Sequence, residues 1–324
     1  MRELTFVQAI TEALGEELAR DERVFLIGED IGRTGGVFGA TRGLWERFGS
    51  TRVRQTPISE SAIIGVATGA ALMGLRPVAE IMYFSFITLA MDQIFNQLVK
   101  FRYMSNGTLY APVVIRTQGG GGRGKGPQHS DSLEAWFYHM PGLKIATPAT
   151  PYDAKGLLKT AIRDDNPVLF LENAMLYNDK GDVPQEDYTV PFGQARIARP
   201  GKDVTIVTYS RMVREALKAA EVLEPAGISA EVIDLRTLIP LDWETVIASV
   251  KKTGRCLVLH EAYKKGGVGS DIAAEIMERA FDYLDAPVLR VGAKDAPIPF
   301  SKPLEEAILP GPADIIEACK TLAR

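Results

Sequence analysis

The sequence predicts an α/β protein with two domains, each built from a parallel sheet covered by helices. Short apolar runs of strand length alternate with helical patterns along most of the chain, which is typical of parallel sheets. The chain has 324 residues, which is more than one hydrophobic core usually supports. A polar stretch with scattered proline and glycine, residues 178–201, interrupts the alternation. We therefore expect a first domain over 1–180, a linker over 181–201 and a second domain over 202–324.

The first domain begins with a helix that Thr5 caps, in which apolar residues recur at helical spacing from Phe6 to Leu18. A buried strand over 24–28 follows, and it ends in two carboxylates, Glu29 and Asp30. Further strands are predicted at 78–83, 112–117, 143–147 and 168–172. Helices near 88–103 and 153–162 fill two of the gaps between them.

The second domain repeats the alternation on a smaller scale. Its strands are predicted at 204–209, 230–235, 256–260 and 288–291. Its helices are predicted at 211–223, 242–251, 270–281 and 313–322. In open sheets of this kind, ligands bind beyond the carboxyl ends of the strands, so polar residues at those ends are the candidates for function.

A sharp corner precedes the most unusual helix of the first domain. Pro57 fixes its own φ and keeps Thr56 extended, so the chain enters the corner as a strand and turns afterwards. A helix capped by Ser59 or Ser61 then begins, which places Glu60 near its N-terminus. On this fragment alone, Glu60 could simply favour the positive end of the helix dipole, worth about 0.3–1 kcal/mol.

The helix after this corner carries small or aliphatic residues from Ala62 to Gly74. Gly65 and Gly69 lie four positions apart and therefore share one face. Another backbone could approach that face closely.

Composition excludes several classes of function. The chain is 46% hydrophobic and 24% charged, as in ordinary globular proteins, and its net charge of −4 argues against nucleic acid as a partner. No uncharged apolar run approaches the length of a membrane span. The only cysteines, Cys256 and Cys319, have no metal-ligand spacing and favour a reducing compartment. With no signal or transit pattern after Met1, we expect a cytoplasmic protein.

A glycine-rich loop after the strand over 112–117 carries one of three histidines, His129. Residues 119–125 have the G-x-x-x-x-G-K spacing of a phosphate-binding loop. Gly126 and Pro127, however, replace the hydroxyl residue and the helix start that such a loop requires. Loops of this kind often carry function, which favours His129 over His139 and His260, although a lone loop histidine is often a solvated bystander.

Taken together, these segments resemble the beta subunit of the thiamine-diphosphate-dependent 2-oxoacid dehydrogenases, a family that includes the pyruvate, branched-chain 2-oxoacid and acetoin enzymes. The resemblance rests on the ordered segments IGED, TPISE, GLRPVAEIMYFSF, MDQIFNQ, QHSDSLEAWF, PGLKIATPATPYDAKGLLKTAIRDDNPV, EVIDLRTLIPLD and HEA. It implies an N-terminal pyrimidine-binding domain and a C-terminal transketolase-like domain, in agreement with the predicted fold.

The resemblance assigns a role to Glu60. In thiamine enzymes a carboxylate hydrogen-bonds a ring nitrogen of the aminopyrimidine and favours its imino tautomer, which then takes the proton of the thiazolium carbon. The cofactor carries the electron-sink chemistry, and the protein supplies position and proton affinity.

The same resemblance implies roles for five other positions in the site. Ile58 and Met82 would line the pyrimidine site, and Phe86 would stack on the ring. For Met82 and Phe86 the alternative is ordinary core packing. His129 would meet the substrate and the lipoyl group, and Glu29 would be a second carboxylate close to the pyrimidine.

One expected motif is missing. Thiamine enzymes bind the diphosphate through magnesium held by a Gly-Asp-Gly segment, and this segment occurs nowhere in the chain, since Val183 follows Gly181 and Asp182. An alpha subunit should therefore bring magnesium and the diphosphate half of the site, in an assembly of two alpha and two beta chains. The lipoyl groups would belong to a dihydrolipoyl acyltransferase core.

The resemblance also implies a potassium ion held mostly by backbone carbonyls. These carbonyls belong to Val113, Ala161, Ile162, Asp164 and Asn166. The alternative at the turn over 162–167 is a simple helix C-cap.

The sequence leaves two classes of function open. In the first, the chain is half of an enzyme that decarboxylates a 2-oxo acid oxidatively and transfers the acyl group to a lipoyl domain, with acetoin as an alternative substrate. In the second, it is a scaffold subunit without chemistry, which would need neither Glu60 nor His129. A stand-alone transketolase-like synthase is a weaker alternative, because the diphosphate motif is missing.

Overall fold

The computed structural model describes residues 1–324, and the chain forms two compact units. The first unit comprises Met1–Gly119 and Phe137–Phe192, and the second comprises Gly120–Trp136 and Gly193–Arg324. The main division thus falls inside the stretch 181–201 that the sequence predicts as a linker. That stretch contains regular structure, because strand β8 (Lys180–Val183) lies at its start and strand β9 (Arg196–Arg199) lies near its end.

The segment Gly120–Trp136 is the main departure from the predicted domain limits of 1–180. It groups with the second unit although it lies in the middle of the first unit's sequence. The alternation of strands and helices carries no information on this point, because the segment is a loop and its partners are far away in the chain.

The sheet of the first unit is parallel, as the alternation predicts, and its strands follow the order β6-β7-β5-β4-β2-β3. The strands are β2 (Val24–Glu29), β3 (Val53–Thr56), β4 (Arg76–Ile81), β5 (Val114–Gly119), β6 (Lys144–Ala146) and β7 (Val168–Asn173). A short strand, β1 (Arg2–Thr5), pairs antiparallel with β8. In this unit β1, β3 and β8 lack a predicted counterpart; each has four residues, most of which are exposed or partly exposed.

Helix α1 (Phe6–Arg20) begins as predicted at Thr5. The Thr5 hydroxyl accepts a hydrogen bond from the Gln8 N–H at 3.3 Å, and the Gln8 side chain accepts one from the Thr5 N–H at 2.9 Å. The other helices of this part of the chain are α2 (Leu44–Phe48), α3 (Glu60–Leu72), α4 (Phe101–Met104), α5 (Glu134–Tyr138) and α6 (Pro151–Arg163).

The helix predicted near 88–103 is divided into three separate helical segments. A 3₁₀ helix covers Phe84–Ala90, a π-helix covers Asp92–Leu98, and α4 follows separately. The buried side chains of this region are Phe84, Ile87, Ala90, Ile94 and Leu98. The first three recur every three residues, which is the period of a 3₁₀ helix, whereas the later ones recur every four. The change of period explains why a single helical pattern does not hold.

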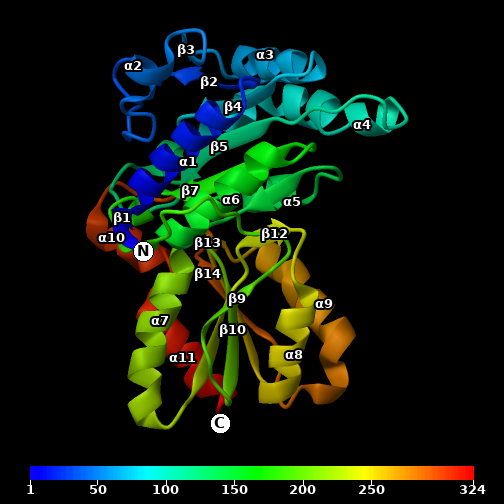
Figure 1. Ribbon diagram of the computed structural model, residues 1–324. Coiled ribbons are helices and arrows are strands. Elements are labelled where there is room, and N and C mark those ends of the chain that lie inside the picture. The colour runs from blue at the N-terminus through cyan, green and yellow to red at the C-terminus, as the bar shows by residue number, and fades with distance from the viewer. The chain divides into compact units, whose positions relative to one another are not determined.

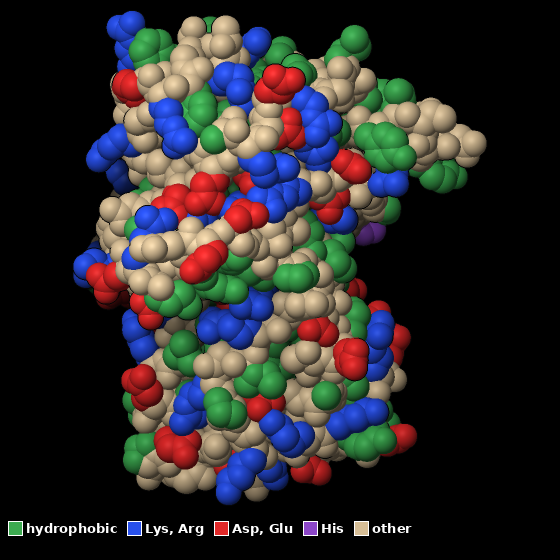
Figure 2. Space-filling model, viewed as in Figure 1, with side chains coloured by type: hydrophobic (Ala, Val, Ile, Leu, Met, Phe, Trp, Pro, Cys, Tyr) green, Lys and Arg blue, Asp and Glu red, His purple; other side chains and the backbone are tan.

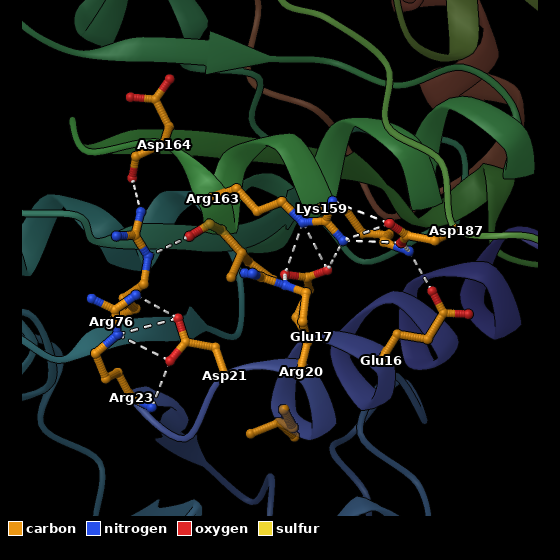
Figure 3. Close-up of polar contacts among 12 residues, drawn as sticks. Glu16, Glu17, Arg20, Asp21, Arg23, Arg76, Lys159, Arg163, Asp164 and Asp187 are labelled. Carbon is orange, nitrogen blue, oxygen red and sulfur yellow. Dashed lines mark hydrogen bonds and ion pairs between the residues drawn. The ribbon is translucent and has the colours of Figure 1, made fainter.

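Helices α1 and α6 pack against each other through ion pairs (Figure 3). The ammonium groups of Lys155 and Lys159 are fully buried and both bind the Glu16 carboxylate. Although burial alone would raise it, these two cations hold the pKa of Glu16 below its usual value. Arg163 adds contacts at 2.6 Å to Glu17 and at 2.9 Å to Asp187. The charges on these helices are therefore satisfied within the chain.

The second unit has a sheet of order β14-β13-β10-β11-β9, parallel except for β9. Its strands are β10 (Val204–Thr208), β11 (Ala230–Asp234), β13 (Cys256–Tyr263) and β14 (Leu289–Ala293), besides β9; a short strand, β12 (Thr237–Ile239), follows β11 in the chain. Its helices are α7 (Arg211–Leu223), α8 (Trp243–Thr253), α9 (Val268–Ala280), α10 (Lys302–Ile308) and α11 (Pro312–Leu322). Helices α7 and α11 cover one face of this sheet, and α8 and α9 cover the other (Figure 1).

All strands and helices that the sequence predicts for the second domain are present, with ends that differ by a few residues. Neither unit contains a helix with the length and apolar character that crossing a membrane requires.

Candidate active site

Glu60 is the first residue of α3, as expected, and its side chain is only 9% exposed. Ser59 occupies the N-cap position, but the prediction that Ser59 or Ser61 caps the helix with its side chain is wrong. The Ser59 hydroxyl donates to the Pro57 carbonyl at 3.1 Å, and the Ser61 hydroxyl donates to the Leu89 carbonyl. The helix N-terminus therefore keeps its positive end next to a buried carboxylate rather than a hydroxyl.

A second carboxylate lies close to Glu60. Glu29 ends β2, and the register of the sheet places it opposite Thr56, just before the corner. Burial, and then the charges of Asp30 and Glu60, raise the pKa of Glu29. The structure thus brings Glu29, Asp30 and Glu60 together beyond the carboxyl ends of β2 and β3, which is where ligands bind in such sheets.

Met82 and Phe86 lie at the carboxyl end of the neighbouring strand β4. Both side chains are partly exposed, whereas Phe84 and Ile87 between and beside them are 2% and 0% exposed. The segment therefore divides into core residues and residues that face outward, and Met82 and Phe86 are on the outward side. This exposure favours a binding surface over the alternative of core packing.

The positions of these two residues are constrained by neighbours. The Met82 carbonyl accepts a hydrogen bond at 2.9 Å from the Gln118 side chain, at the end of β5. The Phe86 ring meets the Tyr83 ring edge to face, with centroids 5.5 Å apart. Ile58, which the sequence also places in the site, is 74% exposed at the corner before α3.

One face of α3 is uncovered. We call Ala62, Gly65, Val66, Gly69 and Met73 the α3 stripe, because they are exposed and recur at helical spacing. A Cβ atom on Gly69 would meet no atom within 4 Å, and one on Gly65 would meet only the Gln93 side chain at 3.9 Å. The expectation that this face is open to another backbone agrees with this geometry.

A buried ion cluster that the sequence reading missed crosses the same sheet. Arg116 of β5 binds Glu172 of β7 at 2.7 Å and Glu80 of β4 at 2.7 Å, and Tyr177 donates to the Glu172 carboxylate. The available signal was the presence of charged residues inside otherwise apolar strands. Because buried charges need partners, Glu80, Arg116 and Glu172 each had to find one, although local sequence does not say which residues pair.

His129 belongs to the second unit and lies on a 3₁₀ turn, Pro127–His129. Its N–H donates to the Gly126 carbonyl at 3.3 Å, and its side chain is partly exposed. The other histidines have different surroundings. His139 is exposed, whereas His260 is fully buried, bonds the Ala262 carbonyl at 3.0 Å, and has its pKa lowered to about 4 by burial.

Comparison with known proteins gives the family. The model described as the transketolase pyrimidine-binding domain matches residues 2–180, and the one described as the transketolase C-terminal domain matches 193–315. The pyruvate dehydrogenase E1 component subunit beta of Bacillus subtilis (strain 168) is 50% identical over 99% of this chain and 98% of its own length. The chain belongs to the beta subunits of the thiamine-diphosphate-dependent 2-oxoacid dehydrogenases.

Other members of the family agree. The 2-oxoisovalerate dehydrogenase subunit beta of Bacillus subtilis (strain 168) is 47% identical over 100% of this chain and 99% of its own length. The mitochondrial pyruvate dehydrogenase E1 component subunit beta of Dictyostelium discoideum is 44% identical over 100% of this chain and 92% of its own length. The family therefore includes beta subunits for pyruvate and for branched-chain 2-oxo acids at nearly equal similarity to this chain.

Solved structures support the fold of the family. A split-gene transketolase, described as an inactive beta4 tetramer, has a TM-score of 0.81 and covers 99% of this chain and 98% of its own, at 24% identity. A Pichia stipitis transketolase mutant has a TM-score of 0.70, covering 100% of this chain and 47% of its own. At these identities the likeness concerns the fold alone, and the two-domain α/β architecture expected from the sequence is confirmed.

Proposed function

We propose that this chain contributes the pyrimidine half of a thiamine diphosphate site to an enzyme that decarboxylates a 2-oxo acid oxidatively and acylates lipoyl groups. The observation that carries the proposal is the buried Glu60 carboxylate at the start of α3, with Glu29 beside it. A scaffold subunit has no use for two neighbouring carboxylates at the ligand-binding edge of a sheet, because their repulsion is destabilising.

The residues at this edge fit the pyrimidine end of the cofactor. Thiamine diphosphate, when bound, supplies the electron sink for decarboxylation. Glu60 would accept a hydrogen bond from a ring nitrogen of the cofactor, and Glu29, whose pKa is raised by burial and by the charges of Asp30 and Glu60, lies close by. The outward-facing Met82 and Phe86, with the exposed Ile58, offer apolar contact to a flat aromatic ring.

The proposal includes an alpha subunit that covers the α3 stripe and brings magnesium and the diphosphate site. Small residues on an uncovered helix face suit a closely approaching partner helix, and Val66 and Met73 are 53% and 85% exposed. Further exposed apolar side chains gather on the segment around α4, seen as green patches in Figure 2; they are Tyr103, Met104, Leu109 and Tyr110. Such uncovered apolar surface is typical of subunits in permanent assemblies. We propose two alpha and two beta chains.

The proposal extends to a potassium ion at the turn that follows α6, where backbone carbonyls supply oxygen ligands of the kind potassium binds. The Val113 and Ala161 carbonyls accept backbone N–H bonds there. Arg76 donates to the Ile162 carbonyl at 2.8 Å and to the Asp164 carbonyl at 2.5 Å (Figure 3). A guanidinium therefore competes with the ion, which would bind weakly through the remaining lone pairs and the Asn166 carbonyl. Equal melting temperatures in potassium and sodium salts would remove the ion from the proposal.

For the second half of the reaction we propose that His129 meets the substrate and the lipoyl group of a dihydrolipoyl acyltransferase core. His129 is partly exposed on a loop, so a substrate or a lipoyl group can reach its imidazole. The substrate is pyruvate or a branched-chain 2-oxo acid, since relatives named for each are 50% and 47% identical to this chain.

The deciding experiment combines the chain with its cognate alpha subunit and a lipoyl domain. We expect magnesium-dependent binding of thiamine diphosphate by the assembly and weak binding by the beta chain alone, because the charged diphosphate needs a cation that this chain has no motif to hold. A panel of pyruvate, branched-chain 2-oxo acids and acetoin then gives the substrate. Full activity of the assembly with Glu60→Gln would contradict the proposal and favour a scaffold role.

A further inference from the structure

The loop that carries His129 has an unusual backbone. We call Gly120–Asp131 the glycine loop. Its φ angle is positive at every second residue of the first half, with values of 88° at Gly120, 95° at Gly122, 62° at Gly124 and 72° at Gly126. Backbones of alternating hand turn successive N–H groups toward one side and create a concave site for an anion. The sequence has the G-x-x-x-x-G-K spacing of a phosphate-binding loop here, but Gly126 and Pro127 argue against such a loop.

The anion in this concavity is a carboxylate of the protein itself. Glu305, on α10, accepts the Gly122 N–H at 2.7 Å through one oxygen and the Gly124 N–H at 3.0 Å through the other. Its side chain is 1% exposed. Hydrogen bonds to a buried carboxylate are stronger than those between neutral groups, so Glu305 fixes two peptide groups of the glycine loop.

A second carboxylate holds the start of the loop. Glu261, on β13, accepts the Gly121 N–H at 2.6 Å. Its other oxygen lies 3.4 Å from Arg211, which in turn donates to the Gly121 carbonyl at 3.3 Å. Both sides of one residue's backbone are thus bound, and the charges of Glu261 and Arg211 compensate each other.

Side chains near α10 fill the remaining space against the loop. A Cβ atom on Gly121 would lie 2.7 Å from the Leu309 side chain, and one on Gly126 would lie 2.3 Å from the Phe300 ring. The glycines are therefore required by close approach of this chain's own segment 300–309. The turn with His129 follows directly, joined by the hydrogen bond from His129 to Gly126.

We propose that Glu305 is a positioning residue, whose carboxylate fills the concave N–H site of the glycine loop and so sets the place of His129. A glycine-rich segment has more backbone freedom than any other, so without an anchor the loop would populate many conformations. The inference rests on the role of His129 under the proposed function. It also means that the loop does not bind phosphate, because an internal anion occupies its N–H groups.

The test uses the assembled alpha–beta enzyme with Glu305→Gln and Glu305→Ala. Glu306→Gln is the matched control, because Glu306 is the next residue, is exposed, and forms an ion pair with Lys302 at 3.8 Å. Amide hydrogen exchange over residues 120–131 should accelerate on the order of tenfold in the Glu305 variants and stay unchanged in the control. The kcat for reductive acylation of a lipoyl domain should fall about 100-fold in Glu305→Ala, with little change in KM, because the catalytic group is misplaced. Glu305→Gln keeps one accepting oxygen and should show a smaller loss.

Faster exchange with an unchanged kcat would overturn the positioning role, as would unchanged exchange. His129→Ala separates this inference from the proposed function. If His129→Ala keeps full reductive acylation, the role of His129 fails, whatever Glu305 does to the loop. If His129→Ala is inactive while the Glu305 variants are fully active, only the positioning role fails.

Should the Glu305 variants not fold, Phe300→Ala replaces them, because Phe300 is exposed and packs on the same loop. Faster exchange with a lower kcat supports the inference, and faster exchange alone overturns it.

Discussion

Two glycine-rich regions of this chain have opposite surroundings. In the α3 stripe, a Cβ atom on Gly69 would meet empty space. In the glycine loop, a Cβ atom on Gly121 or Gly126 would collide with side chains of the segment 300–309. The first region is left open by the chain, and the second is filled by it.

This difference shows that glycine has two uses in the molecule. The glycine loop is complete within the beta chain, because the chain provides both its anion and its packing. The α3 stripe has neither, and under the proposed function the alpha subunit covers it. Substitutions at the two regions should therefore separate the stability of the chain from its assembly.

The largest effect is expected at Glu60, at the head of the open helix. Glu60→Gln keeps the size of the side chain and removes the anion, so proton exchange at the thiazolium carbon should slow by about two orders of magnitude or more in the assembled enzyme. The measurement is hydrogen–deuterium exchange of bound cofactor, followed by magnetic resonance. Glu22→Gln, an exposed residue near the end of α1, is the control. Normal exchange in Glu60→Gln would remove this residue from the site.

Gly69→Leu should have the next largest effect, which is on assembly with the alpha subunit. The beta chain by itself should gain about 0.5–1 kcal/mol of stability, because leucine favours a helix over glycine. Binding to the alpha subunit should weaken by about 100-fold, because the added side chain keeps the partner backbone away. Melting of the beta chain and titration calorimetry with alpha measure the two effects. Unimpaired binding would mean that the α3 stripe is not the contact.

Gly121→Ala should change the stability of the beta chain and leave its assembly with alpha unchanged. Its Cβ would lie 2.7 Å from Leu309 and 3.3 Å from the Glu305 carboxylate. The beta chain itself should lose about 1–3 kcal/mol, as overpacked sites do, while the affinity of the folded chain for alpha should be unaffected. Urea unfolding measures the loss. A stability equal to that of the unmodified chain would show that the loop is less tightly filled than its contacts indicate.

The smallest effect concerns pH, at the end of the segment that contains the glycine loop. Burial, and to a lesser extent the charge of the nearby Glu261, raise the pKa of Glu134 to about 7, against an opposing hydrogen bond with its own backbone. Its Oε2 atom has no hydrogen-bond partner. Burial, and then the charges of Glu134 and Glu261, raise the pKa of the Tyr209 phenol.

The sign follows from the raised pKa. The folded chain holds this proton more tightly than the unfolded chain, whose carboxyl has a pKa of 4.5. The stabilisation from Glu134 is therefore complete below pH 4.5 and is lost as the pH rises to about 7. Urea midpoints between pH 5 and pH 8 should fall for the unmodified chain and fall less for Glu134→Gln. Parallel curves for the two proteins would show that Glu134 does not titrate in this range.

Local pattern was enough for most of the secondary structure. The helix capped by Thr5, the buried strand that ends in Glu29 and the four helices predicted for the second domain follow from the spacing of apolar residues and from capping chemistry, which act over a few neighbouring positions. The region 84–104 shows the limit, because its period changes from three to four and then ends in a separate turn.

The candidate site also has features that local sequence predicts and features that only the tertiary structure decides. The sequence by itself determined that Glu60 begins a helix after a rigid corner and that Glu29 ends a strand, since both positions follow from local rules. That the two carboxylates are neighbours depends on the pairing of β2 with β3. Only the tertiary structure decided that Arg116 joins Glu80 to Glu172, and that Glu305 fills the glycine loop 183 residues before it. A hydrogen bond between such distant residues leaves no trace in local periodicity, because it forms only when the packed core has brought the two segments together.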